Sequence, residues 1–163
     1  MGITLREIVY DVGGGIQGGG TFKAVQTGGP LGGCLPAEHL DTPVDFDSLT
    51  EAGSVMGSGG MIVADQSTCM VEFARYFTQF VCDESCGKCP PCRVGSTRML
   101  EVLERIIQGE GEIEDLDELR RIARGMKHGA LCALGQLAPD PVMSTMMHFE
   151  DEYRAHIIDK TCP

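Results

Sequence analysis

Short apolar runs separated by glycine-rich turns characterise the first 65 residues of the chain. Over residues 4–12, helical spacing places Leu5, Ile8, Val9 and Val12 on one face, with Thr4 as the expected N-cap. The run from Gly13 to Gly15 is expected to end this helix. Residues 22–26 and 60–64 are typical of short strands, whereas 27–36 is turn-rich and 37–60 is expected to be mostly loop. This pattern predicts a small α+β unit.

Helical periodicity dominates the rest of the chain. The apolar spacing predicts a helix over 69–81 that is capped by Ser67 or Thr68, and a second helix, beginning just after Arg93, that stops at Gly109. A third helix is expected behind Asp115, and a fourth from Asp140-Pro141 through Tyr153. Four helices with short connections favour a bundle. The predicted fold class is therefore α+β, with a small unit over 1–65 and an all-α four-helix bundle over 66–163.

Charge and hydropathy exclude several classes of protein. The formal net charge is −11, acidic residues crowd positions 110–118, and no comparable basic run exists, so binding to nucleic acid is not expected. The acidic run is interpreted as a solvated loop. No segment approaches the roughly 20 apolar residues that span a bilayer, and the N-terminus lacks a secretory signal. The chain is expected to be cytoplasmic, without direct membrane insertion, and its eight cysteines indicate metal or redox chemistry.

The most informative segment is Cys86-Gly87-Lys88-Cys89-Pro90-Pro91-Cys92-Arg93. Two-residue spacers place three thiolates on one tight loop, where they can face three corners of an iron–sulfur cubane. The loop lies between two predicted helices. The amides at the start of the second helix, with Lys88 and Arg93, would stabilise thiolates and a net-negative cluster.

A fourth ligand has to come from elsewhere, and two cysteines are candidates. Cys132 lies in the predicted loop between the third and fourth helices, which a bundle places at the same end as the cysteine loop. Cys82, at the end of the first predicted helix, is the cramped alternative. Zinc also binds four thiolates, but structural zinc sites usually have two separated cysteine pairs. A disulfide framework is disfavoured by the cytoplasmic prediction.

Other motifs give weaker indications. Residues 13–18 formally match G-x-G-x-x-G, but they follow a helix, which is the wrong context for a dinucleotide fingerprint, so a turn is expected. Cys34 and Cys69 are interpreted as packed thiols. His156 and Cys162 lie close together in sequence, and they form half of a possible second metal site.

Cys86, Cys89 and Cys92 with their neighbours in ESCGKCPPCR, followed by the lone Cys132, resemble the NADH-binding flavoprotein subunit of respiratory complex I. They also resemble the related subunits of NAD(P)-linked [FeFe]-hydrogenases and formate dehydrogenases. FKAVQTGG at 22–29 and EHLD at 38–41 are similar to the family's soluble-ligand-binding β-grasp domain. The hydrogenase-type subunit is the nearer resemblance, on GGCLP at 32–36 and EDEYRAHIIDKTCP at 150–163.

The resemblance implies that Cys86, Cys89, Cys92 and Cys132 ligate one [4Fe–4S] cluster. It implies a relay of single electrons from reduced FMN at an NAD(P)H site to iron–sulfur clusters in partner subunits. Because the family's FMN- and NAD(P)H-binding portion has no counterpart in these residues, the chain is expected to be a piece of such an oxidoreductase, with an N-terminally truncated β-grasp domain. The alternative function is a non-redox interaction module stabilised by zinc or by bare thiols.

Overall fold

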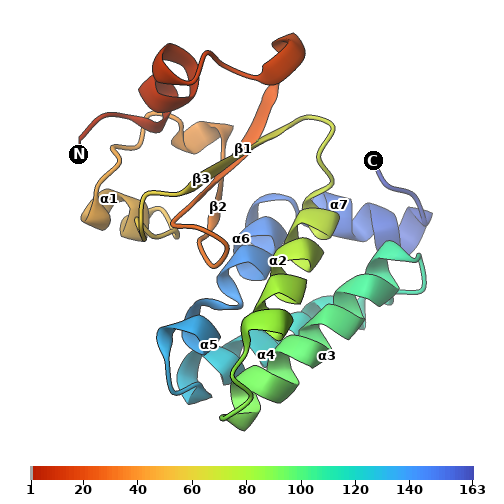
Figure 1. Cartoon of the computed structure of the whole chain (residues 1–163). Helices are drawn as coiled ribbons and strands as arrows, with labels where there is room; N and C mark the ends of the chain where they lie inside the picture. Colours follow the sequence, from red (N-terminus) through yellow and green to blue (C-terminus); the bar gives the residue numbers. More distant parts are fainter. Residues whose placement is uncertain (1) are drawn as a thin grey trace. The chain divides into compact units, whose positions relative to one another are not determined.

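The structure is a computed structural model that describes residues 2–163. The chain divides into two compact units, one ending at Thr68 and the other running from Cys69 to Pro163. The first contains a three-stranded sheet, and the second contains helices (Figure 1). The mixed α+β character expected from the hydrophobic pattern is therefore confirmed.

The sheet of the first unit is antiparallel, with β1 (Phe22–Thr27) between β2 (Cys34–Pro36) and β3 (Met61–Asp65). Val25 pairs with Leu35 on one side and with Val63 on the other. The central strand is more buried than β3, which fits its place between two neighbours. The N-terminal helix, β1, β2 and residues 40–49 together form the core of this unit. Among the described residues, its buried side chains are Leu5, Val9, Phe22, Val25, Leu35, Leu40, Val44 and Leu49.

The first predicted helix forms, and Thr4 begins it. The Glu7 amide donates to Thr4 Oγ1 at 3.2 Å while the Thr4 amide donates to Glu7 Oε2 at 2.8 Å, a reciprocal capping box. The helix continues as the π-helical segment η1 (Glu7–Val12) and ends at Gly13. The glycine-rich motif at 13–18 then runs through a turn into the 3₁₀ segment η2 (Gln17–Gly19), so the expectation of a turn is confirmed.

Three elements of this unit were not expected from the sequence. Residues 37–60 are mostly loop and turn, as expected, but they include the 3₁₀ turn η3 (Ala37–His39) and the helix α1 (Phe46–Glu51). Asp45 caps α1 by accepting a hydrogen bond from the Ser48 amide at 2.8 Å. The turn-rich segment 27–36 also ends in the short strand β2. No local sequence pattern predicts the pairing of β2 with β1.

The second unit contains more helices than the four predicted. The elements are α2 (Met70–Glu84), α3 (Pro90–Ile107), α4 (Glu114–Gly129), α5 (Ala133–Leu137), α6 (Asp140–His148), α7 (Glu150–Arg154) and the π-helical η4 (Ala155–Asp159). The fourth predicted helix is broken at Phe149 (φ −135°, ψ 35°), which separates α6 from α7. Cys69, not Ser67 or Thr68, is the N-cap of α2, since both hydroxyls are engaged by Asp65 Oδ1. The second predicted helix begins at Pro90, before Arg93, because proline suits the first helical turn.

Contacts between the longer helices build the core of this unit. α2 packs against α3 and α6, and α4 packs against α3 and α6. Gly95 lets α3 and α4 approach closely, because a Cβ there would lie 2.6 Å from Cγ of Met126. Tyr153 is fully buried, and its hydroxyl lies 2.7 Å from Thr145 Oγ1. α5 lies against α3 and α4, an element that the bundle prediction lacked.

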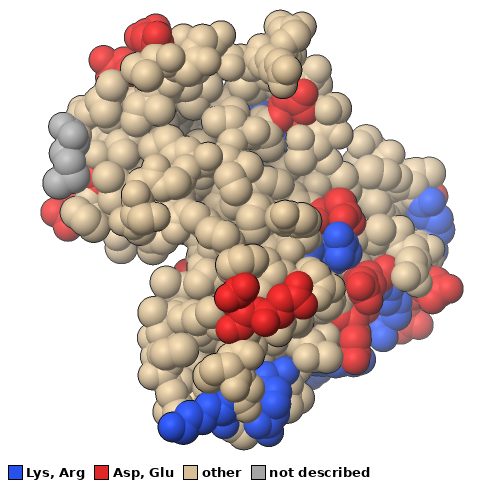
Figure 2. Space-filling view, in the orientation of Figure 1, with Lys and Arg blue, Asp and Glu red and all other residues tan. Residues whose placement is uncertain are grey.

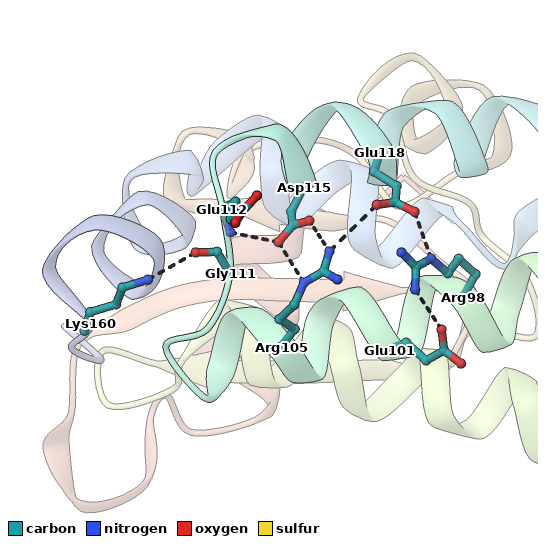
Figure 3. A network of polar contacts seen from close by, with 8 residues as sticks. All are labelled: Arg98, Glu101, Arg105, Gly111, Glu112, Asp115, Glu118 and Lys160. Carbon is teal, nitrogen blue, oxygen red and sulfur yellow. Dashed lines mark hydrogen bonds and ion pairs between the residues drawn. The ribbon is translucent and has the colours of Figure 1, made fainter.

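The acidic run at 110–118 is a solvated loop only in its first half, where residues 110–113 precede α4 and both Glu110 and Glu112 are exposed. Its second half begins α4, where Asp115 is buried and forms an ion pair with Arg105 of α3 (Figure 3). Glu118 accepts from Arg98 Nε at 2.8 Å, and the Glu112 amide donates to Asp115 at 2.9 Å. Buried carboxylates require such partners, so the run joins two helices. Among residues 2–163, no helix is both long enough and apolar enough to cross a membrane.

Candidate metal centre

Three of the predicted ligands lie where α2 gives way to α3. Cys86 is in the connecting loop, Cys89 is the N-cap of α3, and Cys92 is in the first turn of that helix. Gly87 adopts φ +71°, a left-handed conformation that lets the loop turn tightly between the first two cysteines. The two prolines that separate Cys89 from Cys92 occupy the first two helical positions. Local sequence therefore fixes the positions of all three.

The fourth cysteine comes from a distant part of the chain. Cys132 is the N-cap of α5, which lies at the same end of the helical unit as the α2–α3 loop (Figure 1). One pocket of about 100 Å³ is lined by Cys86, Cys89, Cys92 and Cys132. Cys82, the alternative fourth ligand, is not among its lining residues, and burial raises the pKa of the Cys82 thiol.

Close packing holds the two parts of this pocket together. Cys89 and Cys92 form a buried cluster with Ala130, and Leu134 packs against it. A Cβ on Gly135 would lie 2.6 Å from that of Ala130 and 3.0 Å from that of Cys92. Only glycine therefore lets α5 approach α3 this closely. The nearby Gln136 amide group donates to the Ala130 carbonyl at 2.9 Å, which fixes the turn before Cys132.

Hydrogen-bond donors and positive charge surround the sulfurs. The backbone N–H of Leu131, followed by that of Cys92, lowers the pKa of the Cys89 thiol. Ser85 Oγ lies 3.3 Å from Cys92 Sγ, and Arg93 Nη1 donates to the Gly87 carbonyl at 2.5 Å. Lys88 also lines the pocket, and Figure 2 shows basic side chains at this end of the helical unit. At Cys89 the surroundings therefore favour the thiolate form that binds metals.

Exposure differs sharply among the four cysteines. Cys89 and Cys92 are buried, with 8% and 5% of their surface exposed, whereas Cys86 and Cys132 are exposed. Four sulfur donors from one tight loop and one remote turn fit either an iron–sulfur cubane or a tetrahedral zinc ion by donor type. A group bound here would have one side inside the protein and the other at its surface.

A second set of side chains that could ligate a metal lies in the same helical unit, and none of them lines this pocket. Cys69 Sγ lies 3.2 Å from His156 Nε2, and Cys162 completes a group whose donor atoms all lie within 4.8 Å of one another. The pairing of His156 with Cys162 was expected from their spacing, but Cys69 was interpreted as a packed thiol. No local sequence pattern could have placed Cys69 in this group, because it lies 87 positions from His156. Burial raises the pKa of Cys69 to about 11.

Residues 72–156 match the sequence profile of the NADH-ubiquinone oxidoreductase-F iron–sulfur binding region. The chain belongs to this family. The matched segment contains the whole cysteine pocket and covers more than half of the chain. The resemblance inferred from ESCGKCPPCR and the lone Cys132 is thus confirmed.

Curated relatives include a hydrogenase subunit and an NADH-quinone oxidoreductase subunit. The chain is 53% identical over 163 residues to the NADP-reducing hydrogenase subunit HndC of Solidesulfovibrio fructosivorans. It is 45% identical over the same length to an F-type subunit of the NADH-quinone oxidoreductase of Rhizobium meliloti. The higher identity to HndC agrees with the expected nearness to the hydrogenase type. Both alignments cover 100% of this chain but only 33% and 39% of the relatives, so the chain spans a third or so of their length.

Solved structures give the same result. An NAD⁺-reducing [NiFe]-hydrogenase in its H₂-reduced state aligns with a TM-score of 0.85 and 31% identity. That alignment covers 96% of this chain and 26% of the hydrogenase chain. Nearly all of these residues therefore share the fold of part of that hydrogenase chain.

Proposed function

We propose that this chain binds one [4Fe–4S] cluster through Cys86, Cys89, Cys92 and Cys132 and serves as an electron relay. The observation that carries the proposal is that all four cysteines line one pocket, although Cys132 is distant in sequence. Family membership supports an iron–sulfur group over zinc at these four thiols. Such a cluster accepts and releases one electron at a time, with a potential set by hydrogen bonding and burial.

The surrounding residues would stabilise the cluster and tune its potential. Amide donors near Cys89, the first turn of α3 and the charges of Lys88 and Arg93 offset the negative charge of four thiolates. The buried sulfurs of Cys89 and Cys92 exclude water from one side. On the other side, the exposed Cys86 and Cys132 leave a short path for electrons to a neighbouring centre.

The proposed route of the electrons is inferred from what the names of the relatives say. HndC is a subunit of an NADP-reducing hydrogenase, and the relative in Rhizobium meliloti belongs to an NADH-quinone oxidoreductase. We propose that electrons pass between an FMN and NAD(P)H site, in a portion of the parent protein outside these residues, and iron–sulfur clusters of partner subunits. The residues described here would then carry out no NAD(P)H oxidation by themselves.

Metal and sulfide analysis of the anaerobically purified chain tests this proposal. We expect about four irons and four sulfides per chain, and a dithionite-reduced EPR signal of a [4Fe–4S]⁺ centre. Cys132→Ser should remove or convert that signal, whereas Cys82→Ser, outside the pocket, should leave it unchanged. Zinc without sulfide at the four thiols would instead support the non-redox interaction module.

A further inference from the structure

We propose that Ser85 is a positioning residue that raises the reduction potential of the cluster by donating a hydrogen bond to the sulfur of Cys92. The inference rests on the proposed cluster and adds a residue that ligates no iron itself. Ser85 Oγ lies 3.3 Å from Cys92 Sγ, although the two residues flank the loop between α2 and α3. Both residues line the cysteine pocket.

The direction of this hydrogen bond follows from the other contact of the hydroxyl. The Gly87 amide donates to Ser85 Oγ at 3.3 Å, so the oxygen already accepts one hydrogen bond and its own hydrogen is left for another group. A thiolate that binds iron carries no proton and can only accept. In the loaded protein, the Ser85 hydroxyl is therefore the donor and Cys92 Sγ is the acceptor.

The hydroxyl is held in place from both ends of the loop. Ser85 is the C-cap of α2, and the left-handed backbone of Gly87 (φ +71°) turns the amide of that glycine toward the serine. From the α3 side, Arg93 Nη1 donates to the Gly87 carbonyl at 2.5 Å. Both polar backbone groups of Gly87 are thus engaged, which restricts movement of the loop that aims the hydroxyl at Cys92.

Burial makes this donor hard to replace. Cys92 is only 5% exposed, whereas Cys86 and Cys132 are exposed and can accept hydrogen bonds from water. The other buried sulfur, that of Cys89, faces the backbone N–H of Leu131. Water is therefore poorly placed to substitute for the Ser85 hydroxyl at Cys92.

A hydrogen bond to a ligating sulfur acts on the two redox states unequally. Reduction adds one electron to the cluster and makes its sulfurs more negative, so a donor stabilises the reduced state more than the oxidised state. Loss of the Ser85 hydroxyl should therefore lower the reduction potential and leave the four ligands in place.

A redox titration of the iron-loaded chain, with dithionite as the reductant and EPR as the readout, tests the proposal. In Ser85→Ala, the ratio of reduced to oxidised cluster at a fixed solution potential should fall about three- to tenfold, which is a downward shift of about 30–60 mV for a one-electron couple. Iron content should not change. Ser85→Thr keeps the hydroxyl and should restore the potential.

A second measurement separates a hydrogen bond to sulfur from a general effect on the loop. Proton electron–nuclear double resonance of the reduced cluster, compared in H₂O and D₂O, should show an exchangeable coupling in the unchanged chain and in Ser85→Thr that is absent in Ser85→Ala. Ser96→Ala is the matched control, because the Ser96 hydroxyl donates to the Cys92 carbonyl at 2.7 Å and not to its sulfur. That control should alter neither the potential nor the coupling.

An unchanged potential in Ser85→Ala, or an equal shift in Ser96→Ala, would overturn the proposal. Loss of iron from Ser85→Ala would overturn it as well, because Ser85 would then hold the loop instead of tuning the couple. All of these comparisons start from an unchanged chain that contains the cluster. Failure here is therefore distinguishable from failure of the relay proposal, which would appear as zinc without sulfide in the unchanged chain.

Discussion

The two cysteine groups of the helical unit differ in how the chain brings their donors together. In the first, Cys86, Cys89 and Cys92 lie in one loop and the helical turn that follows it, and Cys132 alone is remote. In the second, no two of the three donors share a turn of chain. Cys69 meets His156 across 87 positions, because α2 packs beside α7.

That difference shows what each group depends on. The first is largely encoded by local spacing, so its three-cysteine loop can form wherever α3 forms. The second exists only when the beginning and the end of the helical unit are packed together. Perturbations of tertiary packing should therefore affect the two groups unequally.

The largest effect is expected from Gly135→Ala. The added methyl would lie 2.6 Å from the Ala130 Cβ and 3.0 Å from the Cys92 Cβ, and overpacking of this kind costs about 1–3 kcal/mol. Unfolding by denaturant should show that loss, and iron content should fall.

Gly125→Ala in α4 is the matched control for this change. A Cβ there meets nothing within 4 Å, so alanine should stabilise the helix by up to about 1 kcal/mol without altering iron. Equal iron loss in both variants would contradict the close approach of α5 to α3.

A smaller effect is expected from Lys160→Met, which acts at the other group. It keeps the length of the side chain but removes the hydrogen bond to the Gly111 carbonyl, which is worth about 0.5–1.5 kcal/mol. The free energy of unfolding, measured with denaturant, should fall by about 0.5–1.5 kcal/mol, and the EPR signal of the cluster should not change. Lys127→Met, which breaks an exposed ion pair with Asp140 elsewhere in the unit, should lower the free energy of unfolding by less.

The smallest effect on the protein itself is expected from Leu131→Asp. Leu131 is 74% exposed beside Cys132, so stability should change by no more than about 0.5 kcal/mol. Its backbone N–H, which serves Cys89, is untouched. If the exposed side of the cysteine pocket faces a partner, electron transfer to that partner should slow in the assembled complex. Met147→Asp, at 71% exposure on α6, should leave the transfer rate unchanged.

Much of the helical unit could be predicted from periodicity, because α2, α3 and α4 each bury one apolar stripe. The breaks could not be predicted. Phe149 continues the apolar pattern of α6, yet its backbone leaves the helical region and starts a new segment. The burial of Asp115 within the acidic run could not be predicted for a related reason, because its ion-pair partner, Arg105, lies on another helix. In the first unit, β2 could not be predicted, because a strand of three residues is too short to show an alternating apolar pattern.

The same distinction between local pattern and tertiary contact applies to the candidate sites. The C-x2-C-x2-C spacing indicated the cysteine loop, and the inferred helix order placed Cys132 at the same end. The ligand assignment itself stays a prediction. For the second group, sequence proximity suggested His156 and Cys162, but Cys69 has ordinary neighbours and became a candidate only through tertiary contact.

The hairpin of α3 and α4 is held together along its length by contacts that need no metal. Met126 fills the groove at Gly95, and Arg105 pairs with Asp115 near the far end. Such a scaffold can fold before any iron is delivered, with the sulfur-lined pocket already formed at one end. Maturation of this protein would then be the insertion of a cluster into a preformed helical body, and apo chains should accumulate as folded molecules.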